Sequence, residues 1–274
     1  MLESIVRNAP VFLLVAVRCF ALIMTLPLLS SRNIPRIAKV ALAGYMAFIV
    51  FPQVSLSSGA YADYSKYITS EGSFNLDYIM LLLGEGMIGI IIGFYISIIF
   101  AAFSTAGQFF SFQMGFSASE VYDSMNQVEN PLMGQYFNYI AMLVFLQNNW
   151  FQKLFLGGLV TSFKSLNAFS IVNHNEELAK FMLGGLTTLF KDALIIALPI
   201  MGTLLIINIV FGVMTKAAPQ MNLMSEGFAV LIITSFLLIL SLLPVLINFF
   251  NSSFTEGFKQ LQLLFIKMGG GGIT

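Results

Sequence analysis

Hydrophobic residues fall in long uninterrupted runs that are separated by short polar stretches. Five runs are long enough to cross about 30 Å of hydrocarbon as a helix, and two shorter runs lie between the third and the fourth. Open strands cannot lie in lipid, and the alternation typical of a membrane barrel is absent. The pattern therefore predicts an all-α, polytopic membrane protein built of helical hairpins, with one domain over residues 1–274. The long runs cover residues 10–30, 38–56, 78–103, 193–214 and 227–250, and the shorter ones cover 132–147 and 154–163.

The polar connections differ in charge. Residues 31–39 carry Arg32, Arg36 and Lys39 without an acid, whereas residues 57–77 carry three acids and one base. By the positive-inside rule, the first connection is cytoplasmic and the second lies outside. The chain ends in a glycine-rich stretch, 268–274, which we expect to be flexible.

Composition narrows the possible functions. The chain is 58% hydrophobic and only 9% charged, which is too little charge to cover a soluble protein of this size. Its formal net charge of zero argues against binding to nucleic acid. The single cysteine, Cys19, and the single histidine, His174, do not make a metal site with the usual ligand spacing. Catalytic motifs are also absent, so we expect neither an enzymatic activity nor a cofactor.

Four ionisable residues interrupt the apolar runs: Arg18, Glu85, Lys191 and Asp192. A charge at the centre of a bilayer costs roughly 2.5–3.5 kcal/mol, so each should face protein, water or the membrane interface. We expect Lys191 and Asp192 near the start of a helix. Each should have a partner elsewhere, because adjacent residues do not face each other on a helix.

Glu85 stands at the head of a row of small residues. Spacing by four places Gly89, Gly93 and Ser97, followed by Ala101 and Thr105, on the same helix face. Such a row lets two helices approach closely, either within one chain or between subunits. We therefore predict a tight helix contact in which Glu85 pairs with Arg18 or with a base of a partner chain. The alternative is that the glycines are scattered by chance.

A polar insert separates two apolar segments between residues 109 and 135. It reads FFSFQMGFSASEVYDSMNQVENPLMGQ and holds bulky apolar side chains among its polar and acidic ones. A long insert of this kind inside a compact protein is usually functional, and irregular backbone at membrane depth is tolerated where it lines a cavity. The alternative is an amphipathic hairpin at the lipid surface.

The chain resembles the FliR family of the bacterial flagellar export gate, with its SctT counterparts in type III secretion, along nearly its full length. The first match includes Arg18, Pro27, Arg32 and Pro35. A glycine-bearing helix with Glu85 follows, then the end of a helix and a loop. The last match contains Leu-Pro and Ala-Pro-Gln-x-Asn. In order, the stretches are VRCFALIMTLPLLSSRNIPRIAKVALA, GEGMIGIIIGF, FSTAGQFFSFQMGFS, ENPLMGQ and ALPIMGTLLIINIVFGVMTKAAPQMNLMSEGF.

This resemblance implies a role in protein export. FliR-like proteins assemble with FliP and FliQ into a helical export gate that is joined by FlhB and surrounded by FlhA. The gate passes unfolded flagellar subunits across the inner membrane. A family member looks like a FliP-like unit fused to a FliQ-like unit, which makes the chain from about Phe181 a helical hairpin. The resemblance also implies a place in the flagellar basal body, in contact with membrane lipid and projecting to the periplasmic side.

The resemblance also assigns roles to particular residues. It implies that a loop of about residues 112–132 projects into the lumen as a plug, beside a constriction supplied by FliP. The plug positions are Met114, Phe116, Glu120, Val121, Tyr122, Asp123, Met125, Glu129 and Pro131. We expect assembly or helix packing to involve Arg18, Glu85, Gly89, Gly93, Ser97, Lys191, Asp192, Pro219, Gln220 and Asn222. For the last three, the simpler interpretation is a helix break imposed by Pro219.

A secondary transporter or channel is the main alternative, with the intramembrane charged residues forming a substrate or proton path. The broken helices do not occur in matching halves of the chain, which argues against this alternative. A membrane-embedded enzyme has no catalytic cluster to support it. Between flagellar and virulence cargo, the details of the motifs favour the flagellar one.

Overall fold

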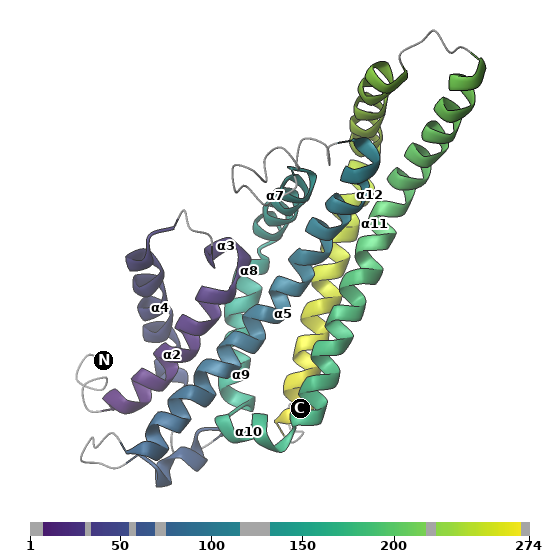
Figure 1. Ribbon diagram of the computed structural model, residues 1–274. Coiled ribbons are helices and arrows are strands. Elements are labelled where there is room, and N and C mark those ends of the chain that lie inside the picture. The colour runs from purple at the N-terminus through teal and green to yellow at the C-terminus, as the bar shows by residue number, and fades with distance from the viewer. Residues whose placement is uncertain are drawn as a thin grey trace. The chain divides into compact units, whose positions relative to one another are not determined.

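Every regular element in the described part of the chain is a helix, as the computed structural model shows (Figure 1). This confirms the all-α prediction. The structure describes residues 8–30, 34–54, 59–68, 75–115, 132–217 and 223–269. In chain order the elements are α2 (Ala9–Thr25), α3 (Pro27–Ser30), α4 (Arg36–Val50), the 3₁₀ turns η1 (Phe51–Gln53) and η2 (Ala62–Lys66), α5 (Leu76–Met114), α7 (Leu132–Gln147), α8 (Trp150–Lys153), the π-helical η4 (Leu154–Leu159), α9 (Val160–Ser165), α10 (Ala168–Asn173), α11 (Asn175–Ala217) and α12 (Leu223–Met268).

The chain forms two compact units, and the three longest helices, α5, α11 and α12, contribute to both. The prediction of a single domain stays a prediction. Unit 1 comprises Met1–Ile98, Asn149–Gly185 and Thr255–Thr274, and unit 2 comprises Ile99–Asn148 and Leu186–Phe254.

In unit 1, α2 packs along α4 (Figure 1). The buried face of α2 includes Val11, Leu14, Arg18 and Leu22, which recur every three or four residues as an amphipathic helix requires. Arg18 is the exception on this face, since a charged side chain in an apolar stripe needs partners of its own. The packing of α2 therefore places the Arg18 cation in the interior of the unit.

The first two apolar runs form helices that are too short to cross a bilayer on their own. Helix α2 has 17 residues and α4 has 15, which correspond to lengths of about 25 and 22 Å against about 30 Å of hydrocarbon. Leu26 is extended because Pro27 follows it, and this ends α2. Helix α4 ends at Val50, where the chain tightens into a 3₁₀ turn that contains Pro52. Hydropathy alone overestimated the length of both helices.

Within the described ranges, three helices are long and apolar enough to span a membrane: α5, α11 and the Glu226–Met268 part of α12. In α5, 56% of the most apolar 18-residue stretch is buried inside the chain, against 22% in α11 and 22% in α12. Most of the apolar surface of the last two helices is therefore left for lipid or for other subunits.

In unit 2, α11 and α12 run antiparallel. Asp192 of α11 meets Ser253 of α12, whereas Phe211, further along α11, lies against Gly227 near the start of α12. The order of the contacts is thus reversed along the two helices. The core of the same unit is aromatic, because the rings of Phe103 and Phe250 lie 4.1 Å apart and both side chains are fully buried.

Candidate functional site

Small residues on α5 bring it into close contact with α2 inside unit 1. A methyl group on Gly89 would lie 2.9 Å from the Cβ of Ala21, and one on Gly93 would collide with the hydroxyl of Thr25. Ser97 donates a hydrogen bond of 2.7 Å to the carbonyl oxygen of Thr25, at the C-terminal end of α2. The close contact expected from the row of small residues thus lies within this chain.

Arg18 and Glu85 form an ion pair at this contact. The Nε of Arg18 lies 2.7 Å from Oε2 of Glu85, and both side chains have 0% exposure. Nη1 of Arg18 donates to Oγ of Ser162 at 3.1 Å, and Nη2 donates to the carbonyl oxygen of Leu166 at 3.0 Å. The guanidinium also lies 4.3 Å from the centre of the Phe163 ring, within the range of a cation–π contact. Each guanidinium nitrogen therefore has a protein partner.

Two tyrosines complete the coordination of Glu85. Tyr61 donates to Oε2 at 2.5 Å, and Tyr64 donates to Oε1 at 2.6 Å. The hydroxyl of Tyr64 also accepts a hydrogen bond of 2.5 Å from the backbone N–H of Ala168 at the start of α10. Burial raises the pKa of both phenols above the usual value, although the Arg18 charge opposes the shift for Tyr61. Both hydroxyls therefore keep their protons and act as donors at neutral pH.

The network joins segments that are far apart in sequence. Arg18 comes from α2, Glu85 from α5, the tyrosines from η2 and the turn before it, and Ser162 from α9. Charges in a dry interior are stable only when paired and hydrogen-bonded, and a pair with one partner missing costs about 3–5 kcal/mol. The site is thus suited to fixing how these segments fit together. Its charged atoms already have protein partners, so it does not resemble a binding or catalytic centre.

Sequence reasoning offered Arg18 as one of two possible partners of Glu85, but it did not find the supporting residues. Tyr61 and Tyr64 lie in a short polar connection, and Ser162 lies in one of the two shorter apolar runs. No motif in either stretch of sequence indicates a partner for the charged pair. The spacing of the two tyrosines is the one available signal, because residues three apart fall on the same face of a helical turn.

Lys191 and Asp192 do not lie near a helix start, so that prediction is wrong. Helix α11 begins at Asn175, well before both residues. The apolar run begins only at residue 193, but the polar residues before it continue the same helix. Asp192 is half-buried in unit 2 and accepts a hydrogen bond of 3.0 Å from Oγ of Ser253, whereas Lys191 is exposed.

Comparison with known proteins places the chain in a family. The family model described as bacterial export proteins, family 1, matches residues 9–257. The flagellar biosynthetic protein FliR of Bacillus subtilis (strain 168) is 26% identical over 272 residues, which cover 98% of this chain and 99% of that protein. The chain belongs to the FliR family of bacterial export proteins.

Other relatives include a further FliR protein and a protein with a different name. FliR of Escherichia coli (strain K12) is 29% identical over 248 residues, covering 89% of this chain and 88% of that protein. The surface presentation of antigens protein SpaR of Shigella sonnei is 29% identical over 186 residues, covering 66% of each. This FliR-family chain is thus a type III export component of the inner membrane.

Most of the predicted plug positions of this FliR-family chain lie outside the described residues. Of these positions, Met114 is described: it is the last residue of α5 and is fully buried in unit 2. Just before it, Gln113 accepts a hydrogen bond of 3.2 Å from the amide of Asn208 on α11. Gly115 follows with a positive φ of 82°, and any side chain there would collide with the ring of Phe228 on α12. The end of α5 is thus held by contacts with both helices of the α11–α12 hairpin. The positions outside the described residues are Phe116, Glu120, Val121, Tyr122, Asp123, Met125, Glu129 and Pro131.

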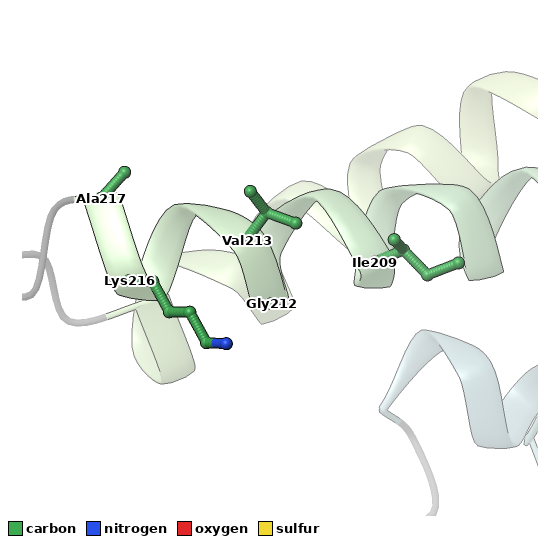
Figure 2. Close-up of a pocket in the computed structure, with 5 residues that line it drawn as sticks. All are labelled: Ile209, Gly212, Val213, Lys216 and Ala217. Carbon is green, nitrogen blue, oxygen red and sulfur yellow. The ribbon is translucent and has the colours of Figure 1, made fainter.

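The Ala-Pro-Gln-Met-Asn turn of the FliR-family chain, with Pro219, Gln220 and Asn222, also lies outside the described residues. A hollow is present on the last turns of α11, just before this turn (Figure 2). Its lining is apolar apart from one lysine and includes no group of acids or histidines. In the described residues, no cluster of three or more His, Cys, Asp or Glu is placed to hold a metal ion. The lining residues are Ile209, Gly212, Val213, Lys216 and Ala217.

Proposed function

We propose that this chain is a non-enzymatic core subunit of the flagellar type III export gate. In this proposal it assembles with FliP-like and FliQ-like subunits, together with FlhB-like and FlhA-like components, into a channel that passes unfolded flagellar subunits across the inner membrane. The assembly projects toward the periplasmic side. Membership of the FliR family supports the proposal, as do the names of the flagellar relatives.

The exposed apolar surface of α11 and α12 carries the assembly part of the proposal. Only 22% of the most apolar stretch of each helix is buried inside the chain, although both are long enough to span a membrane. Exposed side chains such as Leu198, Ile206 and Leu240 form part of this surface. A large exposed apolar surface marks contact with lipid or with other subunits. We propose that FliQ-like and FliP-like helices cover much of it.

The buried ion pair weakens the transporter alternative. A substrate or proton path needs ionisable groups that can exchange partners with a ligand or with water. Arg18 and Glu85 have 0% exposure and bond to each other and to the side chains and backbone around them. These two residues therefore serve packing in unit 1. The transporter alternative then loses two of the charged residues from which it would build a substrate or proton path.

Dependence on partners provides the test of assembly. We expect the chain to accumulate and purify in a monodisperse state only when FliP-like and FliQ-like proteins are produced with it. A control expression without them should give degraded or aggregated chain, because the apolar surface of α11 and α12 is then uncovered. A stable, monodisperse chain that is made alone and does not bind the two partners would contradict the proposal.

The central loop is proposed to plug the closed pore. A stretch that holds bulky apolar side chains excludes water and ions when it fills a constriction. Deleting residues 117–128 should therefore raise ion leakage through gates that still assemble. The matched measurement is the conductance of cells with equal amounts of assembled wild-type and deletion gates. Equal conductance would mean that the loop does not plug the pore.

A further inference from the structure

Two glycines bring α5 and α7 into backbone contact in unit 2. A methyl group on Gly107 would lie 2.5 Å from the carbonyl oxygen of Met133 and 2.8 Å from Cα of Gly134. Both neighbouring atoms belong to the backbone of α7, so a side chain at residue 107 cannot be accommodated by a change of rotamer. The two helices are therefore in close backbone contact at Gly107.

The position of this contact relates it to the central loop. Gly107 lies two turns before the end of α5 at Met114, and Gly134 lies two residues after α7 begins at Leu132. The contact therefore joins the two helices that lead into and out of the loop, close to where each of them ends. Any change in the distance between the helices at this point changes the separation of the ends of the loop.

Aromatic packing holds the same two helices together. The rings of Phe110 on α5 and Phe137 on α7 lie 5.1 Å apart in an edge-to-face arrangement. Phe137 also lies 6.4 Å from Phe250 of α12, and all three side chains are fully buried. Separating α5 from α7 would expose these rings, because a close-packed core has no voids into which bulky side chains could move.

We propose that Gly107 and Gly134 form a fixed frame that positions the ends of the central loop, and that export leaves α5 and α7 in contact. The inference rests on the proposed plug function of the loop. Gly107 and Gly134 act as positioning residues, because they set the separation of the helices on which the loop is carried. Opening of the pore then takes place without movement of α5 against α7 at this level.

A disulfide provides the direct test. A Cβ on Gly134 would lie 3.2 Å from Oγ of Ser104, which is close to the separation of about 3 Å between Cβ and the opposite sulfur that disulfide geometry implies. The variant Ser104→Cys/Gly134→Cys should therefore form an internal crosslink under mild oxidation in assembled gates. Each single cysteine variant is the control, since the native Cys19 is buried.

The export rate of the crosslinked gate decides the proposal. We expect it to stay within twofold of the rate of the reduced gate. A loss of more than tenfold that is reversed by reduction would mean that the helices must separate, and it would overturn the proposal. Failure of the crosslink to form in assembled gates would also overturn it, because the helices would then not be in contact.

A pair of alanine variants tests positioning separately from assembly. Gly107→Ala pushes α5 away from α7, and we expect ion leakage to rise at least threefold at equal amounts of assembled gate. Gly44→Ala on α4 is the control, because a methyl group there would have no atom within 4 Å and the residue lies outside the α11–α12 surface that is proposed to contact other subunits. Unchanged leakage in Gly107→Ala would overturn the frame. If that variant does not assemble, the crosslink experiment decides.

Comparison with the loop deletion separates the two proposals. If gates with the deletion of residues 117–128 leak ions and gates with Gly107→Ala do not, the plug proposal is supported and the frame proposal is wrong. When neither leaks in assembled gates, the plug itself is wrong. When both leak and the crosslinked gate still exports, both proposals are supported.

Discussion

The interiors of the two units are held together by different kinds of contact. The centre of unit 1 is an ion pair whose atoms all bond to named neighbours: Arg18 to Glu85, Ser162 and the Leu166 carbonyl, and Glu85 to two tyrosine hydroxyls. The centre of unit 2 is a set of buried phenylalanine rings beside a close glycine contact. One acid in unit 2, Asp192, is half-buried and bonds to a single serine hydroxyl.

This difference indicates which contacts define each unit. Hydrogen bonds and charges are directional, so a saturated network accepts only one arrangement of the segments that supply it. Apolar rings attract one another without such demands and tolerate substitutions that conserve volume. Unit 1 is therefore expected to depend on a few individual polar residues, whereas unit 2 is expected to depend on the total volume of its core and on the close approach of its backbones.

Neutralising one acid in each unit, Glu85 in unit 1 and Asp192 in unit 2, should give the largest contrast. Glu85→Gln leaves Arg18 as a buried cation without a counter-charge, so we expect a loss of about 3–5 kcal/mol in the stability of the chain. Asp192→Asn keeps a group that can accept the Ser253 hydrogen bond in a half-buried place, and should cost less than about 1 kcal/mol. Thermal unfolding of each variant, purified with its partners, measures the difference. Equal losses would remove the distinction between the units.

A compensated variant sharpens that result. Replacing both charges by apolar residues of similar volume, Arg18→Met with Glu85→Leu, avoids an unpaired ion and should recover part of the loss. Recovery should stay incomplete, because Tyr61 and Tyr64 lose the carboxylate that accepts their hydrogen bonds. For the same reason, exchanging the two charges should not restore stability: a guanidinium cannot accept hydrogen bonds from phenols. Full recovery by the exchanged pair would mean that charge alone matters.

Packing at the glycines of unit 1 should give an intermediate effect. Gly89→Ala pushes a methyl group against Ala21 and the α2 backbone, and overpacking of this kind costs about 1–3 kcal/mol. Gly44→Ala is the matched control on α4, because a methyl group there meets nothing within 4 Å and should stabilise the helix by up to about 1 kcal/mol. Thermal midpoints of the two variants should therefore move in opposite directions. A stabilised Gly89→Ala would mean that α2 and α5 are not in close contact.

Sequence reasoning reached the helical class, and it offered Arg18 as one of two possible partners of Glu85, because both inferences depend on strong local signals. Long apolar runs give the helices, and a charge within such a run demands a partner. It missed Tyr61 and Tyr64, because their role depends on a fold that brings a polar connection onto α5. It also misplaced Lys191 and Asp192, because the rise in hydropathy after them was taken for the start of a helix, although α11 begins at Asn175 and helix formers continue on both sides.

The contact between Gly107 and Gly134 shows the same limit. Gly107 and Gly202 both lie inside long helices, yet a methyl group would meet the α7 backbone at the first and no atom within 4 Å at the second, and only the tertiary fold reveals this difference. The row of small residues after Glu85 was visible because spacing by four repeats along one helix. A single glycine that meets a single glycine on another helix leaves no repeat in the sequence.

The smallest expected effect concerns the hydrogen bond between Ser253 and Asp192. Ser253→Ala removes the donor and should cost about 1 kcal/mol, partly offset by the better helix propensity of alanine. Ser252→Ala is the matched control. Ser252 is the neighbouring residue on the same helix, its side chain is exposed, and its replacement by alanine brings the same gain in helix propensity. The difference between the two thermal unfolding energies therefore isolates the bond. A zero difference would mean that water replaces the serine, and that unit 2 owes its stability to its aromatic core without help from this polar pair.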